Sequence, residues 1–292
     1  MKQLITLLAT AIFCTSVGAQ TDSSRHPGSD TIRIGGIIIV KHGKTNGSND
    51  NNTSKHFNQK KINSNVSTNW WIIDLGFSNY SDKTNYSAAT ADQYLVNKPG
   101  STLPLGISDF KVKTGKSINV NIWVFMQRVN LIRHYVNLKY GLGVELNNYR
   151  YNADLSYKKS GTSPYPSISP IPHAYVIRDS ISFSKNKLAA DYLTIPLMIN
   201  FITNPSHPKK GLNLSAGLSA GYLYSQRNKQ KSSERGKQYN KGDYDLNRFK
   251  LSYIGDLGFG PLHLYGSYSP RSFYEKSLDM RPYTVGIRFS NW

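Results

Sequence analysis

The sequence predicts an all-β fold, an eight-stranded antiparallel transmembrane β-barrel preceded by a largely disordered N-terminal segment. Three observations predict it. Eight segments alternate between apolar and polar residues, the connections between them alternate between long and short, and the polar side of the alternation is dominated by Gly, Ser, Asn and Thr. Period-2 alternation is the pattern of a strand with two different faces.

The alternation is clearest in two segments. Residues 135–146 place Val, Leu and Tyr on one face and Asn, Lys, Gly and Glu on the other, and residues 212–224 repeat the pattern with Leu, Ala and Tyr against Asn, Ser and Gly. Weaker versions occupy residues 71–77, 118–124, 193–201, 249–259, 262–268 and 283–289. These eight segments are the expected strands.

The connections alternate in length along the whole chain. Long ones cover residues 80–115, 152–187, 226–245 and 270–281, and short ones cover residues 130–134, 203–210 and 258–261. Barrels of the outer membrane have short periplasmic turns and longer extracellular loops. The spacing therefore predicts that all short turns lie at one end of a membrane barrel.

Side-chain size indicates which face is inside. Small polar residues fit the narrow lumen of an eight-stranded barrel, so the large apolar set is expected to face lipid. Aromatic residues at the strand ends form two expected girdles at the membrane interfaces. The periplasmic girdle comprises Trp71, Phe201, Phe259 and Phe289, and the outer girdle comprises Tyr222, Tyr224, Phe249, Tyr268 and Tyr283.

The same phase places charged residues in the lumen. Three acids face three bases, and buried charges are stable only when paired, so a structural network of salt bridges is expected. Its members are Asp74, Lys139, Glu145, Lys250, Asp256 and Arg288. Asp74 and Arg288 lie on the first and last strands and are expected to help close the barrel. Trp70, Trp123, Phe125 and Tyr192 share the inward phase and would fill much of the lumen.

Three regions are expected along the chain. Residues 1–19 combine Lys2, an apolar stretch and small residues before Gln20, which predicts a signal peptide. Residues 20–67 are expected to form a periplasmic tail with a short Ile-rich strand at 30–41, a candidate for pairing with a periplasmic protein partner. Residues 68–292 form the expected outer-membrane barrel.

Composition excludes several classes. The single Cys rules out a disulfide scaffold, and no apolar run reaches the roughly 18 residues of a membrane helix. The formal charge is +19, but the export signal makes nucleic acid a poor explanation of it.

No cofactor and no metal are expected, because the seven His form no cluster at a recognised ligand spacing. His263 lies in the lumen phase near Ser267 and Ser269, and His173 lies in a Pro-rich loop; neither predicts a catalytic site.

Four stretches carry a family resemblance: residues 68–77 (TNWWIIDLGF), 140–149 (YGLGVELNNY), 192–201 (YLTIPLMINF) and 283–289 (YTVGIRF). Together they resemble the PorT-like outer-membrane β-barrel proteins of Bacteroidota. The resemblance implies location in the cell outer membrane with periplasmic N- and C-termini. Trp292 is similar to the terminal aromatic residue that the barrel-assembly machinery reads during biogenesis, although it is out of phase with Phe289.

The function expected from the sequence is a non-catalytic structural or interaction role in the cell envelope, accessory to secretion as the resemblance implies. The alternative is a small porin-like channel, and a lipid-modifying barrel enzyme is a third, less favoured hypothesis. Outer-membrane lipid and lipopolysaccharide are the expected surroundings, and the basic segment 226–245 is suited to their phosphates.

Overall fold

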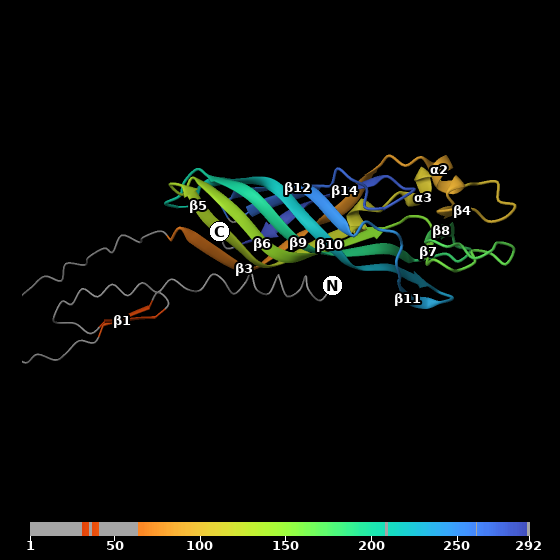
Figure 1. Cartoon of the computed structure of the whole chain (residues 1–292), viewed down its shortest axis with the longest axis horizontal. Coiled ribbons are helices and arrows are strands. Elements are labelled where there is room, and N and C mark those ends of the chain that lie inside the picture. The colour runs from red at the N-terminus through yellow and green to blue at the C-terminus, as the bar shows by residue number, and fades with distance from the viewer. Residues whose placement is uncertain (1–30, 35–36, 41–63, 208–209, 261, 291–292) are drawn as a thin grey trace, which may run out of the picture. The chain divides into compact units, whose positions relative to one another are not determined.

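The computed structural model describes residues 31–34, 37–40, 64–207, 210–260 and 262–290 (Figure 1). The chain divides into two units, Met1–Lys61 and Ile62–Trp292. In the first unit, β1 (Thr31–Ile34) pairs antiparallel with β2 (Ile37–Val40). One strand was expected between residues 30 and 41, and the structure has two. The predicted signal peptide, most of the predicted tail and Trp292 lie outside the described residues.

The second unit contains a closed ring of eight antiparallel strands, which confirms the predicted fold class. Each strand pairs with the next in sequence, and the last pairs with the first, with Arg288 directly opposite Asp74. The strands are β3 (Val66–Asp82), β5 (Ile118–Ile132), β6 (Val136–Arg150), β9 (Lys185–Ile202), β10 (Leu212–Ser232), β12 (Phe249–Phe259), β13 (Leu262–Tyr268) and β14 (Met280–Phe289). Among the described residues, no helix is both long and apolar enough to cross a membrane.

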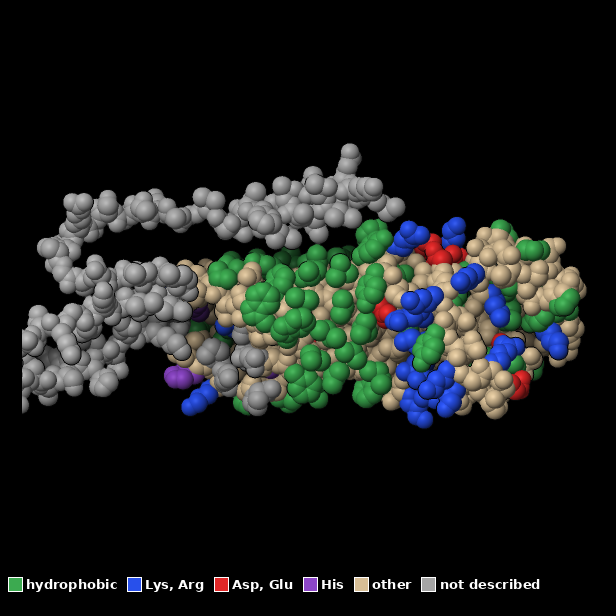
Figure 2. All heavy atoms as spheres, turned by 90° about the horizontal axis from the view of Figure 1, so that it is seen from below, with side chains coloured by type: hydrophobic (Ala, Val, Ile, Leu, Met, Phe, Trp, Pro, Cys, Tyr) green, Lys and Arg blue, Asp and Glu red, His purple; other side chains and the backbone are tan. Residues whose placement is uncertain are grey.

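The barrel wall is apolar outside and polar inside. On β10, Leu212 and Leu214 are exposed while the intervening Asn213 is buried, and the alternation continues to Tyr224. Figure 2 shows exposed apolar side chains gathered in a band across the face of the barrel that is in view. A tilted transmembrane strand needs about 9–11 residues. The exposed apolar stretch of β10 meets that length, so the band is the lipid-facing surface.

One irregularity in the wall corrects the predicted inward set. Trp71 has a positive φ of 57°, and the β5–β6 register shifts between Trp123 and Phe125. Such a bulge moves the following side chains to the opposite face of the sheet. Trp70 is therefore exposed on the outside, where its ring lies 6.0 Å from that of Phe125, while Ile72, on the other side of the bulge, keeps the inward phase and is buried. The predicted inward placement is wrong for Trp70 and Phe125 and holds for Trp123 and Tyr192.

The long connections fold into a compact cap at one end of the barrel (Figure 1). The first carries α2 (Tyr86–Ala91), β4 (Leu95–Val96), α3 (Ile107–Phe110) and the 3-10 helix η1 (Thr114–Lys116). The second carries β7 (Leu155–Lys158) and β8 (Tyr175–Arg178), which form a small sheet with β4. In the third, β10 continues to Ser232 and pairs with β11 (Gly236–Lys241). The predicted loop 226–245 is thus mostly strand.

Candidate functional site: a charged lumen beneath an aromatic cap

The lumen contains a chain of ion pairs that joins four strands. Arg288 on β14 donates two hydrogen bonds to Asp74 on β3, from Nε to Oδ1 at 2.7 Å and from Nη2 to Oδ2 at 2.9 Å. Its Nη1 lies 3.3 Å from Oδ2 of Asp256 on β12. Asp256 also accepts a 2.7 Å hydrogen bond from Nζ of Lys139 on β6. All four side chains are almost fully buried.

The other two charged residues form a separate pair. Lys250 on β12 donates to Glu145 on β6, and its Nζ lies 4.8 Å from the centre of the Tyr192 ring. Glu145 also accepts a hydrogen bond of 2.9 Å from Asn147. The structure therefore brings together all six charged residues singled out in the sequence, as two networks. Because each charge has an opposite partner, the desolvation cost of burial is offset.

The lumen between these networks is nearly filled. A cavity between Trp123, Met198 and Tyr265 has a volume of about 20 Å³. A single water molecule needs about 10–15 Å³ measured in this way. At this level the interior is a packed core with space for about one water molecule.

The structure places His263, which the sequence put in the lumen phase without a role, beside the charge network. It is 2% exposed, and its Nδ1 lies 3.6 Å from Oδ1 of Asp256. Ser267 pairs with Thr284 at 2.6 Å, and Ser269 donates to the carbonyls of Leu251 and Arg271. Neither serine is hydrogen-bonded to His263, so no base and nucleophile are paired there. The part of the chain that the structure describes holds no group of three or more possible metal ligands.

The aromatic residues expected at the two rims all lie on the outer surface. At the end with the short turns, Trp71, Phe201, Phe259 and Phe289 are exposed. At the cap end, Tyr222, Tyr224, Phe249, Tyr268 and Tyr283 are exposed, and the rings of Tyr222 and Phe249 lie 5.3 Å apart. Aromatic side chains in such rows suit the boundary between lipid tails and water.

The cap closes the lumen with a core made largely of tyrosine. Tyr157 hydrogen-bonds through its hydroxyl to Tyr151 at 2.7 Å and to Tyr274 at 2.6 Å. Burial raises the pKa of Tyr151 to about 12 and raises that of Tyr157 well above its usual range. The phenols therefore stay neutral and can act as donors and acceptors to one another. The remaining members of this core include Tyr80, Tyr94, Phe110, Tyr149, Leu155, Tyr244 and Phe273. Sequence reasoning missed the cap, because its residues come from four separated connections.

Cations gather on the outer surface between the apolar band and the cap (Figure 2). Two rows cross neighbouring strands, and within each row the residues are direct cross-strand partners. One row is Arg150, Lys187 and Lys229, and the other is Lys185, Lys231 and Lys237. Burial and the neighbouring cations lower the pKa of Lys187. We call these two rows the cation rows. Like charges directly opposite each other destabilise a sheet, so the stability of the fold does not explain why cations occupy these positions.

This geometry defines the class of protein: a membrane-spanning barrel with a closed lumen and a folded cap. The sequence matches the family described as "Outer membrane protein beta-barrel domain" over residues 96–270, which is more than half of the chain. The chain belongs to that family and is an outer-membrane β-barrel protein. No curated protein matches the sequence.

Two similar solved structures are both of Ail, the attachment invasion locus protein of Yersinia pestis. The first is 12% identical with a TM-score of 0.29, and covers 76% of this chain and 98% of that one. The second, in complex with the heparin analogue sucrose octasulfate, is 13% identical with a TM-score of 0.28 and the same coverage.

Proposed function

We propose that the protein is a non-catalytic interaction protein of the outer membrane, with the cap on the cell exterior and both termini in the periplasm. The observation that carries this proposal is the closed interior. Paired charges fill the barrel, and a hydrogen-bonded aromatic core lies over its cap end. Among the described residues, the space between the two charge networks measures about 20 Å³, which holds about one water molecule, so the surfaces proposed for function are the cap and the outer wall.

A small porin-like channel is the competing function, and conductance separates the two. Purified protein in planar bilayers is expected to give no steady open level. A matched variant, Lys139→Ala with Asp256→Ala, removes one buried ion pair of 2.7 Å and tests whether the lumen can be opened at all. Stable conductance of the unmodified protein would refute the closed-lumen proposal.

The cation rows support contact with anionic lipid of the outer leaflet, including lipopolysaccharide. On β9 and β10 they lie at the cap end, next along the strand to the exposed apolar residues 193–201 and 212–224, which is where lipid phosphates would be. None of Lys185, Lys187, Lys229 and Lys231 takes part in an ion pair found among the described residues, and phosphates would offset their mutual repulsion.

The lipid contact can be measured with vesicles that contain lipopolysaccharide or only zwitterionic lipid. Lys187→Gln with Lys229→Gln is expected to lower the thermal stability gained from lipopolysaccharide and to leave stability in zwitterionic vesicles unchanged or raised. Lys210→Gln, at the opposite end of the barrel, is the matched control. An equal gain from lipopolysaccharide in all three proteins would contradict this contact.

The proposal includes two features expected from the residues, export by the signal peptide of residues 1–19 and a periplasmic partner at residues 30–41. It also includes two that the resemblance implies, membership of the PorT-like group and an accessory role in secretion. What supports the periplasmic partner is that β1 and β2 pair only with each other in the described chain, which leaves outer strand edges for a further strand. Deleting residues 30–41 is expected to abolish periplasmic cross-links while the barrel still migrates as a heat-modifiable species. Unchanged cross-links would count against this partner.

A further inference from the structure

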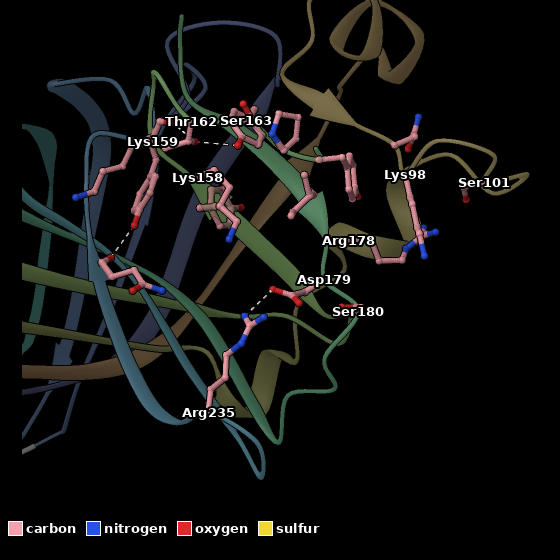
Figure 3. Close-up of a pocket in the computed structure, with 18 of the residues that line it drawn as sticks. Lys98, Ser101, Lys158, Lys159, Thr162, Ser163, Arg178, Asp179, Ser180 and Arg235 are labelled. Atoms are coloured by element: carbon pink, nitrogen blue, oxygen red, sulfur yellow. Dashed lines mark hydrogen bonds and ion pairs between the residues drawn. The ribbon is translucent and has the colours of Figure 1, made fainter. Parts of the chain in front are cut away.

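The cap contains a cavity of about 810 Å³ that is unrelated to the lumen (Figure 3). Its walls come from four stretches that are distant in sequence: residues 97–103, 157–165, 175–180 and 235–244. Pockets that bind small molecules typically measure about 300–1,000 Å³. The cavity therefore has room for a ligand of two or three sugar rings.

The charges around this cavity do not balance. Five cations line it, Lys98, Lys158, Lys159, Arg178 and Arg235, against one acid, Asp179. Arg235 is 3.5 Å from Asp179, and Arg178 is paired with Asp109 at 2.7 Å. The three lysines take part in none of the ion pairs found among the described residues, so their ammonium groups have no carboxylate to oppose them.

Arg178 is held rigidly at the wall of the cavity. Its Nε and Nη2 both donate to Asp109, and Nη1 donates to the carbonyl oxygen of Leu103 at 3.0 Å. Asp179 is held in the same way by a hydrogen bond of 2.7 Å from Ser156. Such fixed groups lose little conformational freedom when a ligand binds.

The position of Lys159 depends on a glycine. A Cβ at Gly242 would lie 2.7 Å from Cε of Lys159 and 2.8 Å from its Cγ, so the stem of this lysine lies against the backbone where only glycine leaves space. The aliphatic stem of Lys159 forms part of the cavity wall, and the residue is exposed to solvent. Lys159 therefore lies at the edge of the cavity, with its side chain directed away from Lys98 and Lys158 (Figure 3), and it belongs to none of the ion pairs found among the described residues.

The remaining lining is aromatic and hydroxyl-rich. Tyr157, Tyr175 and Tyr244 are buried in the wall, and Tyr165 is half-buried. The Tyr175 hydroxyl is 2.9 Å from that of Thr162, and the side chains of Asn97, Ser101, Ser163, Ser180 and Asn240 also line the space. Tyr165 is thus the tyrosine that offers ring surface to this space, and the hydroxyl and amide groups beside it suit a molecule that carries hydroxyl groups.

We propose that this cavity binds an anionic saccharide, with Lys98, Lys158 and Lys159 holding its carboxylate, sulfate or phosphate groups and the exposed part of the Tyr165 ring packing against one of its sugar rings. Ammonium groups form strong, charge-assisted hydrogen bonds with such anions. The site lies within the cap, beyond the cation rows that flank the apolar band, so a soluble or surface-attached glycan is favoured over a lipid headgroup. The inference goes beyond the proposed envelope role and does not depend on it.

The test uses the full-length protein refolded in micelles and isothermal titration with a uronic-acid disaccharide. The neutral disaccharide maltose and inorganic phosphate are titrated in parallel. We expect binding of the uronic-acid disaccharide, and at least tenfold weaker binding of the other two. Lys158→Gln with Lys159→Gln is expected to weaken binding by about a hundredfold, since a charge-assisted contact contributes roughly a factor of ten.

Two further variants keep the result interpretable. Lys113→Gln with Lys116→Gln removes the same charge from exposed positions beside and within η1, outside both the cavity and the cation rows, and should bind like the unmodified protein. Gly242→Val keeps every charge and should weaken binding by displacing Lys159. Heat-modifiable migration on gels verifies that each variant is folded. Equal binding by both double-lysine variants, or phosphate binding as tight as that of the disaccharide, would overturn the proposal.

The source of the saccharide is a separate arm of the experiment. Polysaccharide released from the cell's own lipopolysaccharide and a foreign sulfated glycan each compete with the disaccharide if they occupy the cavity. Competition by either supports the site and identifies where its ligand comes from. Failure of both, together with no binding of the disaccharide, would refute it.

Discussion

Replacing Arg288 tests whether the lumen network stabilises the barrel. In Arg288→Met, Asp74 loses two hydrogen bonds of 2.7 and 2.9 Å, and Asp256 loses a cation at 3.3 Å. Asp74 is fully buried, so its charge is left with neutral donors only, Trp123 at 2.8 Å and Asn121 at 3.2 Å.

The expected loss of unfolding free energy follows from these contacts. Two hydrogen bonds to a charged group contribute about 1.5–3 kcal/mol each. Breaking a buried ion pair from one side costs about 3–5 kcal/mol, which measures the same loss in another way. We therefore expect Arg288→Met to lower the free energy of unfolding by about 3–5 kcal/mol, as measured by guanidinium titration in micelles.

Two controls make the prediction specific. Arg281 lies on the same strand and binds Asp279 with the same geometry, at 3.0 and 2.8 Å, but on the surface. Arg281→Met should leave stability unchanged, because water screens an exposed pair. Adding Asp74→Asn to Arg288→Met should recover about 1–2 kcal/mol by removing the stranded charge. A loss below about 1 kcal/mol in Arg288→Met, or strict additivity in the double variant, would refute the reasoning.

Two other predictions follow from the lumen and the cap. Gly143→Val should destabilise the barrel by about 1–3 kcal/mol, because its Cβ would come within 2.8 Å of Cα of Trp123, whereas Ala216→Val on the lipid side should be tolerated; the folded fraction on unboiled gels measures both. Alkaline titration followed at 295 nm should show tyrosines that ionise near pH 12. Burial raises the pKa of Tyr151 to about 12, so the cap is at full stability below about pH 10 and loses it as the pH rises towards 12. Ionisation of every tyrosine near pH 10 in the folded protein would contradict the buried core.

The wall of the barrel was predictable because lipid and lumen impose opposite chemistry on alternate residues. That logic fails where alternation carries no apolar signal. Along the outer part of β10, Asn228, Gln230 and Ser232 are the buried side chains, and Gln230 donates to Ser156 at 2.8 Å. Buried and exposed positions are both polar there, so the segment reads as a basic loop when it is a strand.

The wall irregularity and the cap were beyond sequence reasoning for a different reason. The positive φ of Trp71 leaves the local pattern of aromatic and aliphatic residues unchanged, so nothing in the sequence marks the change of face that exposes Trp70. The cap depends on contacts such as that between Tyr157 and Tyr274, residues far apart in sequence. For the lumen charges, strand phase alone was enough to bring the acids and bases together, but it did not reveal that His263 lies beside Asp256.

The register that sets Arg288 opposite Asp74 has a consequence for closure of the barrel. Asp74 lies on β3, the first strand of the barrel, and its countercharge lies on β14, the last. A sheet in which β14 has not paired with β3 would hold an unneutralised carboxylate, and placing such a charge in a bilayer costs several kcal/mol. Pairing of the first strand with the last therefore neutralises a charge as well as completing the hydrogen-bond ladder, so the seam itself favours the closed barrel over an open sheet.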